Sequence, residues 1–385
     1  MLFDDISREY QGPALYSEPR FTYLNRSARP EVVRIRASLE EWFSHYPEGD
    51  SKKDVAGRFR SGDDAQYRSA FFELLLHELL LQLKCELEPH PVIEGTTNRP
   101  DFLVKPTIAS PFYLELAVVS DESDDEAAAR ARINVIYDAL DRLNSPDFFV
   151  EIRLSGLPAS QLSARHVRAF LARNLASVDP DEITRLYKVK GLDALPRWSF
   201  REQDWTVDFC PIPKKPEARG KPGVRPIGAI TSPAREIDPG SAIRDTLMDK
   251  AGHYGELNLP YVIAVNELTE FGTHTGDVME ALFGKEHALI PRDSLSKGDV
   301  RWERAPDGLW TSPSGPRYTR VSCVMIARVD AWDIPKAPIC LYHNPWAQYA
   351  YSSPLTNLPQ AKAENGEMKW FNGKLLGELL HLPLS

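Results

Sequence analysis

Cysteine is scarce in this chain of 385 residues, and the four that are present form no CxxC pair. They stand far apart, at Cys85, Cys210, Cys323 and Cys340. This spacing is typical neither of a disulfide scaffold nor of a zinc site, so we expect small buried thiols in a reducing compartment.

Long apolar runs and excess positive charge are also lacking. No segment approaches the ~20 apolar residues that span a bilayer, and the first ten residues carry acids where a secretory signal carries cations. We therefore expect a cytoplasmic protein without a membrane partner. The formal charge of −9 argues against a protein that coats nucleic acid non-specifically, although it allows a local basic groove.

The hydrophobic periodicity predicts a mixed α/β protein without internal repeats. The predicted helices cover 32–43, 61–83, most of 121–144 and 164–178, and the predicted strands cover 86–93, 100–105, 112–119 and 148–156. The order from residue 61 to the last of these strands is α-β-β-β-α-β. Further strands and helices follow after residue 181, in a less regular pattern.

Three acids interrupt this pattern in otherwise apolar elements. Glu73 lies in the apolar helix, Asp101 opens a strand after Pro100, and Glu115 lies in the middle of "FYLELAVV". A buried carboxylate is costly unless it is paired or holds a metal. Three of them in a helix–strand–strand succession favour a divalent-cation site, and we expect the three carboxylates to meet at one point.

This arrangement resembles the PD-(D/E)XK nuclease superfamily, with Pro100-Asp101 as the PD and Glu115-Leu116-Ala117 in place of the ExK. The resemblance implies a restriction-endonuclease-like αβββαβ core and a nuclease that cleaves DNA with Mg²⁺ or Mn²⁺ held by Glu73, Asp101 and Glu115. By analogy, its role would lie in bacterial defence or DNA metabolism. The implied organisation is an N-terminal arm and helix (1–60), the nuclease-like core (61–180) and a C-terminal α/β elaboration (181–385) that could continue the core sheet.

The chain departs from the motif at one position, because Ala117 stands where the family has lysine. Three interpretations remain open: a degenerate relative, a lysine supplied from elsewhere, or a mechanism that uses the metal alone. Lys105 lies four residues along the strand from Asp101, roughly 13 Å away. Lys250 is a candidate if its helix covers the site.

The helical periodicity around Glu73 predicts where two nearby side chains lie. His77 shares its helical face and is expected to be a core histidine, whereas Glu78 is expected at the surface.

A basic segment rich in Pro and Gly is the candidate for binding nucleic acid. Its five cations are Lys214, Lys215, Arg219, Lys221 and Arg225. Such residues can contact phosphates, and the nearby aromatics Trp198, Phe200 and Trp205 could stack on bases. An ordinary surface loop is the competing interpretation. For the whole chain, the alternative to a nuclease is a non-catalytic nucleic-acid-binding or assembly protein on the same fold.

Overall fold

The fold is known from a computed structural model. It describes residues 1–385 except 121, 222–223, 232–237, 290–300, 353 and 384–385. The chain forms two compact units. Unit 1 comprises Met1–Gly12, Pro19–Asp121 and Ile237–Ser385, and unit 2 comprises Pro13–Glu18 and Glu122–Glu236. Most of unit 2 is therefore an insertion within the sequence of unit 1.

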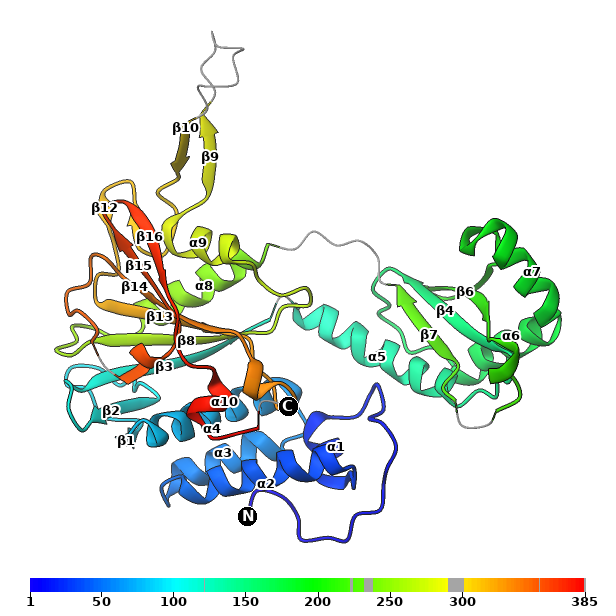
Figure 1. Ribbon diagram of the computed structural model, residues 1–385, viewed down its shortest axis with the longest axis horizontal. Coiled ribbons are helices and arrows are strands. Elements are labelled where there is room, and N and C mark those ends of the chain that lie inside the picture. The colour runs from blue at the N-terminus through cyan, green and yellow to red at the C-terminus, as the bar shows by residue number, and fades with distance from the viewer. Residues whose placement is uncertain (121, 222–223, 232–237, 290–300, 353, 384–385) are drawn as a thin grey trace. The chain divides into compact units, whose positions relative to one another are not determined.

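Unit 1 is built on an eight-stranded mixed sheet with the order β1-β2-β3-β8-β13-β14-β15-β16 (Figure 1). Its strands are β1 (Cys85–Pro89), β2 (Phe102–Pro106), β3 (Phe112–Val119), β8 (Tyr261–Glu267), β13 (Val321–Ala327), β14 (Ile339–His343), β15 (Gln360–Glu364) and β16 (Glu367–Phe371). The first three strands form an antiparallel meander, and β3, β8 and β13 are parallel neighbours. All seven residues of β8 are buried, as expected of a central parallel strand.

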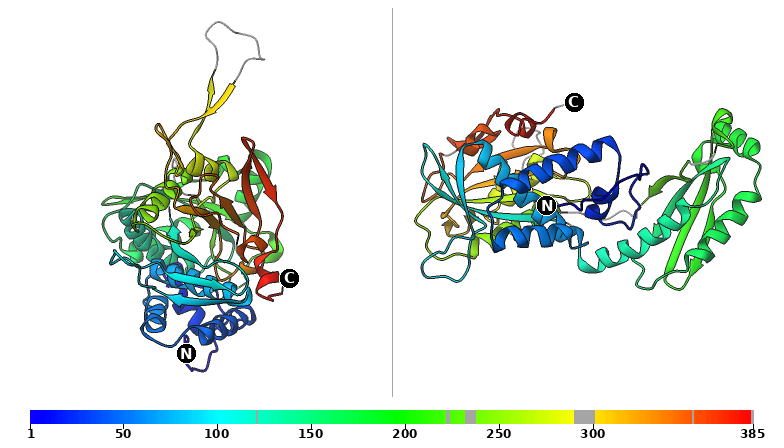
Figure 2. Two further views of the ribbon diagram at one scale, coloured as in Figure 1. Left: turned by 90° about the vertical axis from the view of Figure 1, so that its left-hand side faces the viewer. Right: turned by 90° about the horizontal axis from the view of Figure 1, so that it is seen from below.

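The remaining elements of unit 1 are helices and two short hairpins. Its helices are α1 (Arg20–Arg26), α2 (Pro30–His45), α3 (Asp50–Arg60), α4 (Asp64–Gln82), α8 (Pro239–Gly252), α9 (Thr275–Phe283) and α10 (Leu376–Leu379). Two short hairpins pair β9 (Glu286–Leu289) with β10 (Arg301–Arg304) and β11 (Thr311–Ser312) with β12 (Gly315–Pro316). The β9–β10 hairpin extends away from the large sheet (Figure 1, Figure 2).

Helix α4 is capped at its N-terminus by Asp63, whose side chain accepts hydrogen bonds from the backbone N–H groups of Ala65 and Gln66. Twelve of its residues are buried, which agrees with its nearly continuous apolar surface. It packs against β1 and β3 on one side and against α2 and α3 on the other. The helix is therefore sandwiched between the sheet and a helical layer.

The other face of β3 is covered by α8. Tyr113, Ala117 and Val119, which alternate along β3, share a core cluster with Leu247 and Ala251 of α8. Side chains alternate between the faces of a strand, so Glu115 belongs to this same face. Helix α9 packs beside α8.

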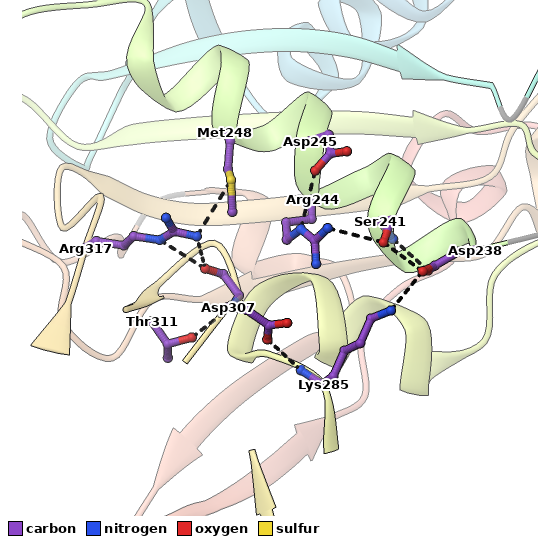
Figure 3. Close-up of polar contacts among 10 residues, drawn as sticks. Asp238, Ser241, Arg244, Asp245, Met248, Lys285, Asp307, Thr311 and Arg317 are labelled. Carbon is purple, nitrogen blue, oxygen red and sulfur yellow. Dashed lines mark hydrogen bonds and ion pairs between the residues drawn. The ribbon is translucent and has the colours of Figure 1, made fainter. Parts of the chain in front are cut away.

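Polar contacts hold α8 at both ends. Figure 3 shows Asp238, whose carboxylate accepts hydrogen bonds from Ser241 and from Lys285 Nζ at 3.0 Å. Beyond the other end, Arg320 donates to the carbonyls of Tyr254 and Gly255. These contacts fix the helix against the sheet and so determine which of its side chains reach β3.

Unit 2 has its own four-stranded sheet, with the order β5-β6-β4-β7. Its elements are α5 (Asp124–Asp141), β4 (Phe148–Ser155), α6 (Ala164–Ala176), α7 (Pro180–Lys190), β5 (Trp198–Glu202), β6 (Trp205–Pro213) and β7 (Ile227–Thr231). The acidic start of α5 forms a capping box between Ser123 and Glu126. Its apolar face joins β4, β6 and α6 in a separate core.

The mixed α/β class expected from the sequence is observed, but the elements are distributed differently. The helix expected within 121–144 and the strand expected at 148–156 do not complete the large sheet; they are α5 and β4 of unit 2. The division therefore does not follow the expected boundaries at residues 60 and 180. The strands after residue 260 do continue the large sheet. Hydrophobic periodicity identifies an element but carries no information on which strand it will pair with, and this explains the difference.

The N-terminal segment is more helical than expected, since α1 and α3 lie outside the one helix predicted there, at 32–43. Within the described residues, no helix combines the length and the apolar character needed to cross a membrane.

Candidate functional site

Asp101 and Glu115 lie next to each other at the point where β2 begins. The β2–β3 register runs through Val104 opposite Phe112 to Phe102 opposite Leu114, so the next residues outward are Asp101 and Glu115. Asp101 Oδ2 accepts a hydrogen bond of 2.7 Å from the backbone N–H of Leu116. The Asp101 side chain thus binds the β3 backbone just beyond the last residue pair of the β2–β3 ladder.

The position of Asp101 favours its protonated form. Burial, followed by the negative charges of Glu115 and Glu73, raises the pKa of Asp101 to about 8. The Leu116 N–H and the Lys250 ammonium act in the opposite direction with smaller effect. Near neutral pH this carboxyl group therefore carries a proton that an approaching cation could displace.

Glu115 is 5% exposed, and both of its carboxylate oxygens are engaged. Lys250 Nζ lies 2.7 Å from Oε1, and the Tyr254 hydroxyl donates to Oε2 at 2.6 Å. Burial lowers the pKa of Lys250, but the Glu115 carboxylate, together with the charges of Asp101 and Asp249, leaves that pKa above its usual value. The ammonium and Glu115 therefore form a charged pair beneath α8.

Lys250 is a candidate for the displaced lysine if its helix covers the site; helix α8 does cover this face of β3, and the ammonium reaches Glu115. Ala117 lies two residues after Glu115 on the same strand face and is packed in the cluster that includes Ala251. A longer side chain at position 117 would meet α8. Lys105, the other lysine considered, instead pairs with Glu88 at 2.8 Å near the surface.

Glu73 is buried close enough to influence Asp101 but makes its contacts with the helical layer. Its Oε1 accepts from the Tyr46 hydroxyl at 2.6 Å, and its Oε2 lies 2.5 Å from Arg58 Nη2. The structure therefore brings Asp101 and Glu115 together and directs the Glu73 carboxylate to Arg58 and Tyr46.

The two neighbours of Glu73 behave differently from each other. His77 is a core residue as expected: its ring lies 4.6 Å from that of Tyr46, and burial lowers its pKa to about 4. The expectation for Glu78 is wrong, because it is 2% exposed and bonded to His45 Nδ1 at 2.8 Å. Helix α2 covers a face of α4 that would otherwise be at the surface.

Asp101 and Glu115 are the type of ligand that a magnesium ion requires, but their arrangement meets its needs only in part. Carboxylate oxygens such as those of Asp101 and Glu115 are the ligands that Mg²⁺ prefers. Among the described residues, however, no group of three or more His, Cys, Asp or Glu side chains is arranged to hold a metal ion. Lys250 contacts one oxygen of Glu115, so a metal at this place would require the ammonium to move aside.

The basic segment 214–225 lies in unit 2, and three of its five cations have intramolecular partners. Lys214 is buried and donates to the Ser145 carbonyl at 2.8 Å. Arg219 binds Asp181, and Arg225 binds Asp141, each at 2.7 Å. Lys215 and Lys221 are exposed, and no polar side-chain contact is recorded for either within the described residues. Of the nearby aromatics, Trp205 is 2% exposed and donates its indole N–H to the Ser160 carbonyl, so it cannot stack on a base.

Three residues of this neighbourhood were missed by sequence reasoning, namely Tyr46, Arg58 and Tyr254. Tyr254 stands four residues after Lys250, a spacing that places two side chains on one side of a helix end. Arg58 belongs to α3, a polar segment outside the helices predicted from the sequence. Only the spacing of Tyr254 offered a usable signal.

No family model, curated protein or solved structure matches this chain.

Proposed function

We propose that the protein is a metal-dependent nuclease that hydrolyses phosphodiester bonds, with DNA as its expected substrate, and that Lys250 takes the role of the missing motif lysine. The observation that carries the proposal is the 2.7 Å contact between Lys250 Nζ and Glu115, one residue pair beyond the end of the β2–β3 ladder, where Asp101 also lies. A carboxylate pair with an adjacent ammonium is the set of groups that the PD-(D/E)XK chemistry requires.

The order of elements supports a restriction-endonuclease-like core once unit 2 is left out of the count. Helix α4, the meander β1-β2-β3, helix α8 and the parallel strand β8 follow one another in unit 1, and the four strands are neighbours in that order. This is an αβββαβ succession whose second helix and fourth strand come from residues 239–267, not from residues 124–155. Fold and activity are separate inferences, so the site residues carry the functional argument.

In this proposal each side chain has a defined task. Asp101 and Glu115 would hold Mg²⁺ or Mn²⁺, which supplies positive charge near the phosphoryl oxygens and a more acidic water. Asp101 would serve as a ligand in its ionised form, after losing the proton on its carboxyl group to solvent. Lys250 releases Glu115 Oε1 and presents its ammonium to a phosphate oxygen, while the Tyr254 hydroxyl keeps Glu115 Oε2 in place. Glu73 acts through its charge on Asp101 and is kept in position by Arg58 and Tyr46.

The test is cleavage of labelled DNA and RNA by purified protein with millimolar Mg²⁺ or Mn²⁺. The variants are Lys250→Ala, Asp101→Asn and Glu115→Gln, with Lys105→Ala as the matched control. Lys105 also forms an ion pair with a glutamate at 2.8 Å but lies near the surface. We expect the three site variants to lose about 10²-fold or more in rate and the control to retain full activity. Cleavage that survives Lys250→Ala would remove that residue from the mechanism.

A non-catalytic nucleic-acid-binding or assembly protein is the second candidate, and one specific observation favours it. Glu115 and Glu73 are each bonded to one cation and one tyrosine, an arrangement that satisfies a buried carboxylate without any metal. In that case neither Mg²⁺ nor Mn²⁺ would raise the melting temperature, and no nucleic acid would be cut. A metal-dependent rise in melting temperature that is lost in Asp101→Asn would exclude a purely structural site.

A further inference from the structure

A second site lies elsewhere in unit 1, at the carboxyl ends of the parallel strands β8 and β13. A cavity of about 290 Å³ opens there, between the start of α9 and the strands β14 and β16. Its lining includes Glu267, Thr273, Arg328, Tyr342 and Trp370. The carboxyl ends of parallel strands are where open α/β sheets commonly bind ligands. Glu267 is paired in register with Val119, four residues along β3 from Glu115, so this cavity is distinct from the carboxylate pair.

Glu267 forms the closed, inner side of the cavity. It is fully buried, and its Oε1 accepts hydrogen bonds from the backbone N–H and the hydroxyl of Thr269. Its Oε2 accepts from the Thr273 hydroxyl at 2.6 Å and lies 3.4 Å from Arg328 Nη1. The charge of Glu267 is thus satisfied from within the protein, and it is not available to attract a cationic ligand.

Arg328 is the accessible charge of the cavity, and its backbone is fixed on both sides. Its N–H donates to the Pro338 carbonyl, and the following residue, Val329, exchanges two hydrogen bonds with the buried Asn266. Its guanidinium lies so close to Gly272, where φ is +75°, that a Cβ at this position would collide with it. The Arg328 side chain is 39% exposed, and the Glu267 contact is its one recorded polar side-chain contact within the described part of the chain. Most of its hydrogen-bonding capacity therefore remains for a ligand.

The opposite side of the cavity is aromatic and apolar. Trp370 lies on β16 and is 51% exposed, and its ring meets that of Tyr342 edge-on at a centroid distance of 5.9 Å. Val278, Ile326 and Ile339 add apolar surface. An exposed indole held at a fixed angle offers a flat face for stacking.

We propose that this cavity binds a small planar organic anion, with its ring against Trp370 and its anionic group on Arg328. A guanidinium binds carboxylate or phosphate through paired hydrogen bonds. The volume lies at the lower end of the range for ligand pockets, which limits the ligand to an aromatic carboxylate or, at most, a single nucleotide. The proposal does not depend on the nuclease activity.

Calorimetric titration of the full chain tests the proposal with benzoate and adenosine 5′-monophosphate as probes. Benzyl alcohol is the matched probe without charge, and inorganic phosphate is the matched probe without a ring. We expect saturable binding of benzoate or the nucleotide. Benzyl alcohol should bind about 10- to 100-fold more weakly than benzoate, the change that losing a charge-assisted hydrogen bond produces. Inorganic phosphate should bind more weakly than the nucleotide, because it has no ring to stack on Trp370. Failure of both planar anions to bind at about 10 mM, or equal binding of benzoate and benzyl alcohol, would overturn the proposal.

Two variants locate the binding. Arg328→Gln should weaken it about 10-fold or more, and Trp370→Ala should remove the stacking surface without altering the buried core. Lys374→Gln, an exposed cation outside the cavity lining, is the control and should bind as the wild type does. Because Arg328 also faces a buried carboxylate, its substitution could impair folding; Trp370→Ala then decides the question alone. Binding unchanged by Trp370→Ala would refute the assigned site.

Discussion

Replacing Lys250 by methionine should destabilise unit 1 far more than replacing an exposed lysine. The change keeps most of the side-chain length and leaves Glu115, which is 5% exposed, with the Tyr254 hydroxyl as its remaining partner. At an effective dielectric constant of about 20, unit charges 2.7 Å apart attract by about 6 kcal/mol. The cost of burying both ions opposes that attraction, and water reaches Lys250, whose side chain is 26% exposed. We therefore expect a loss of about 2–4 kcal/mol in the free energy of unfolding.

The measurement uses two buried cysteines that report on the two units separately. Cys323 lies in β13 of unit 1 and Cys210 in β6 of unit 2, and both are fully buried. Thiol labelling at increasing denaturant concentration, read by mass spectrometry, should show Cys323 reacting at lower denaturant in Lys250→Met and Cys210 unchanged.

The matched control is Lys105→Met, which breaks a surface pair with Glu88 at nearly the same distance. Exposed pairs contribute about 0–1 kcal/mol. Adding Glu115→Gln to Lys250→Met should restore part of the lost stability, because it removes the uncompensated charge. Equal shifts in Lys250→Met and Lys105→Met would refute the reasoning that the pair is buried and coupled.

Three further predictions use the same labelling assay. The pKa of Asp101 is about 8 in the folded protein, against an ordinary value of 3.8, so the stability it contributes is complete below pH 3.8 and is lost as the pH rises through 8. The stability of Asp101→Asn relative to the wild type should therefore increase between pH 5 and 9. A stability difference that does not change with pH would contradict this prediction. Ala117→Lys should cost about 1–3 kcal/mol by overpacking against α8, seen as earlier labelling in unit 1, and should not raise cleavage if Lys250 already supplies the ammonium. Lys214→Met should leave a backbone carbonyl unpaired and destabilise unit 2 by about 1–3 kcal/mol, detected at Cys210, whereas Lys215→Met should leave labelling unchanged.

The sequence predicted the elements around the candidate site well because each is strongly patterned. The strand expected at 112–119 is β3 with the same bounds, and the helix expected at 61–83 is α4. Alternation along a strand was enough to place Glu115 and Ala117 on one face, and the succession of two strands was enough to bring Asp101 beside Glu115. Local periodicity and antiparallel pairing carry this information.

What the sequence could not predict depends on contacts between distant segments. The order α-β-β-β-α-β reads the same whether its last helix and strand are α5 and β4 or α8 and β8, and pairing alone distinguishes them. The burial of Glu78 depends on α2, and the partner of Glu73 comes from the polar helix α3. The sequence patterns of α2 and α3 do not indicate that these helices pack on α4.

The insertion between β3 and α8 has a consequence for synthesis of the chain on the ribosome. Glu115 and Lys250 are 135 residues apart in sequence, and translation at 5–20 residues per second separates their appearance by about 7–27 s. During that interval Glu115 is present without the ammonium or the helix that covers it, while unit 2 is being completed. The carboxylate therefore stays exposed to water on the meander, and helix α8 can cover it only after unit 2 has been made. Shortening the insertion would bring the two halves of unit 1 together earlier, so the length of the insertion sets the duration of this delay.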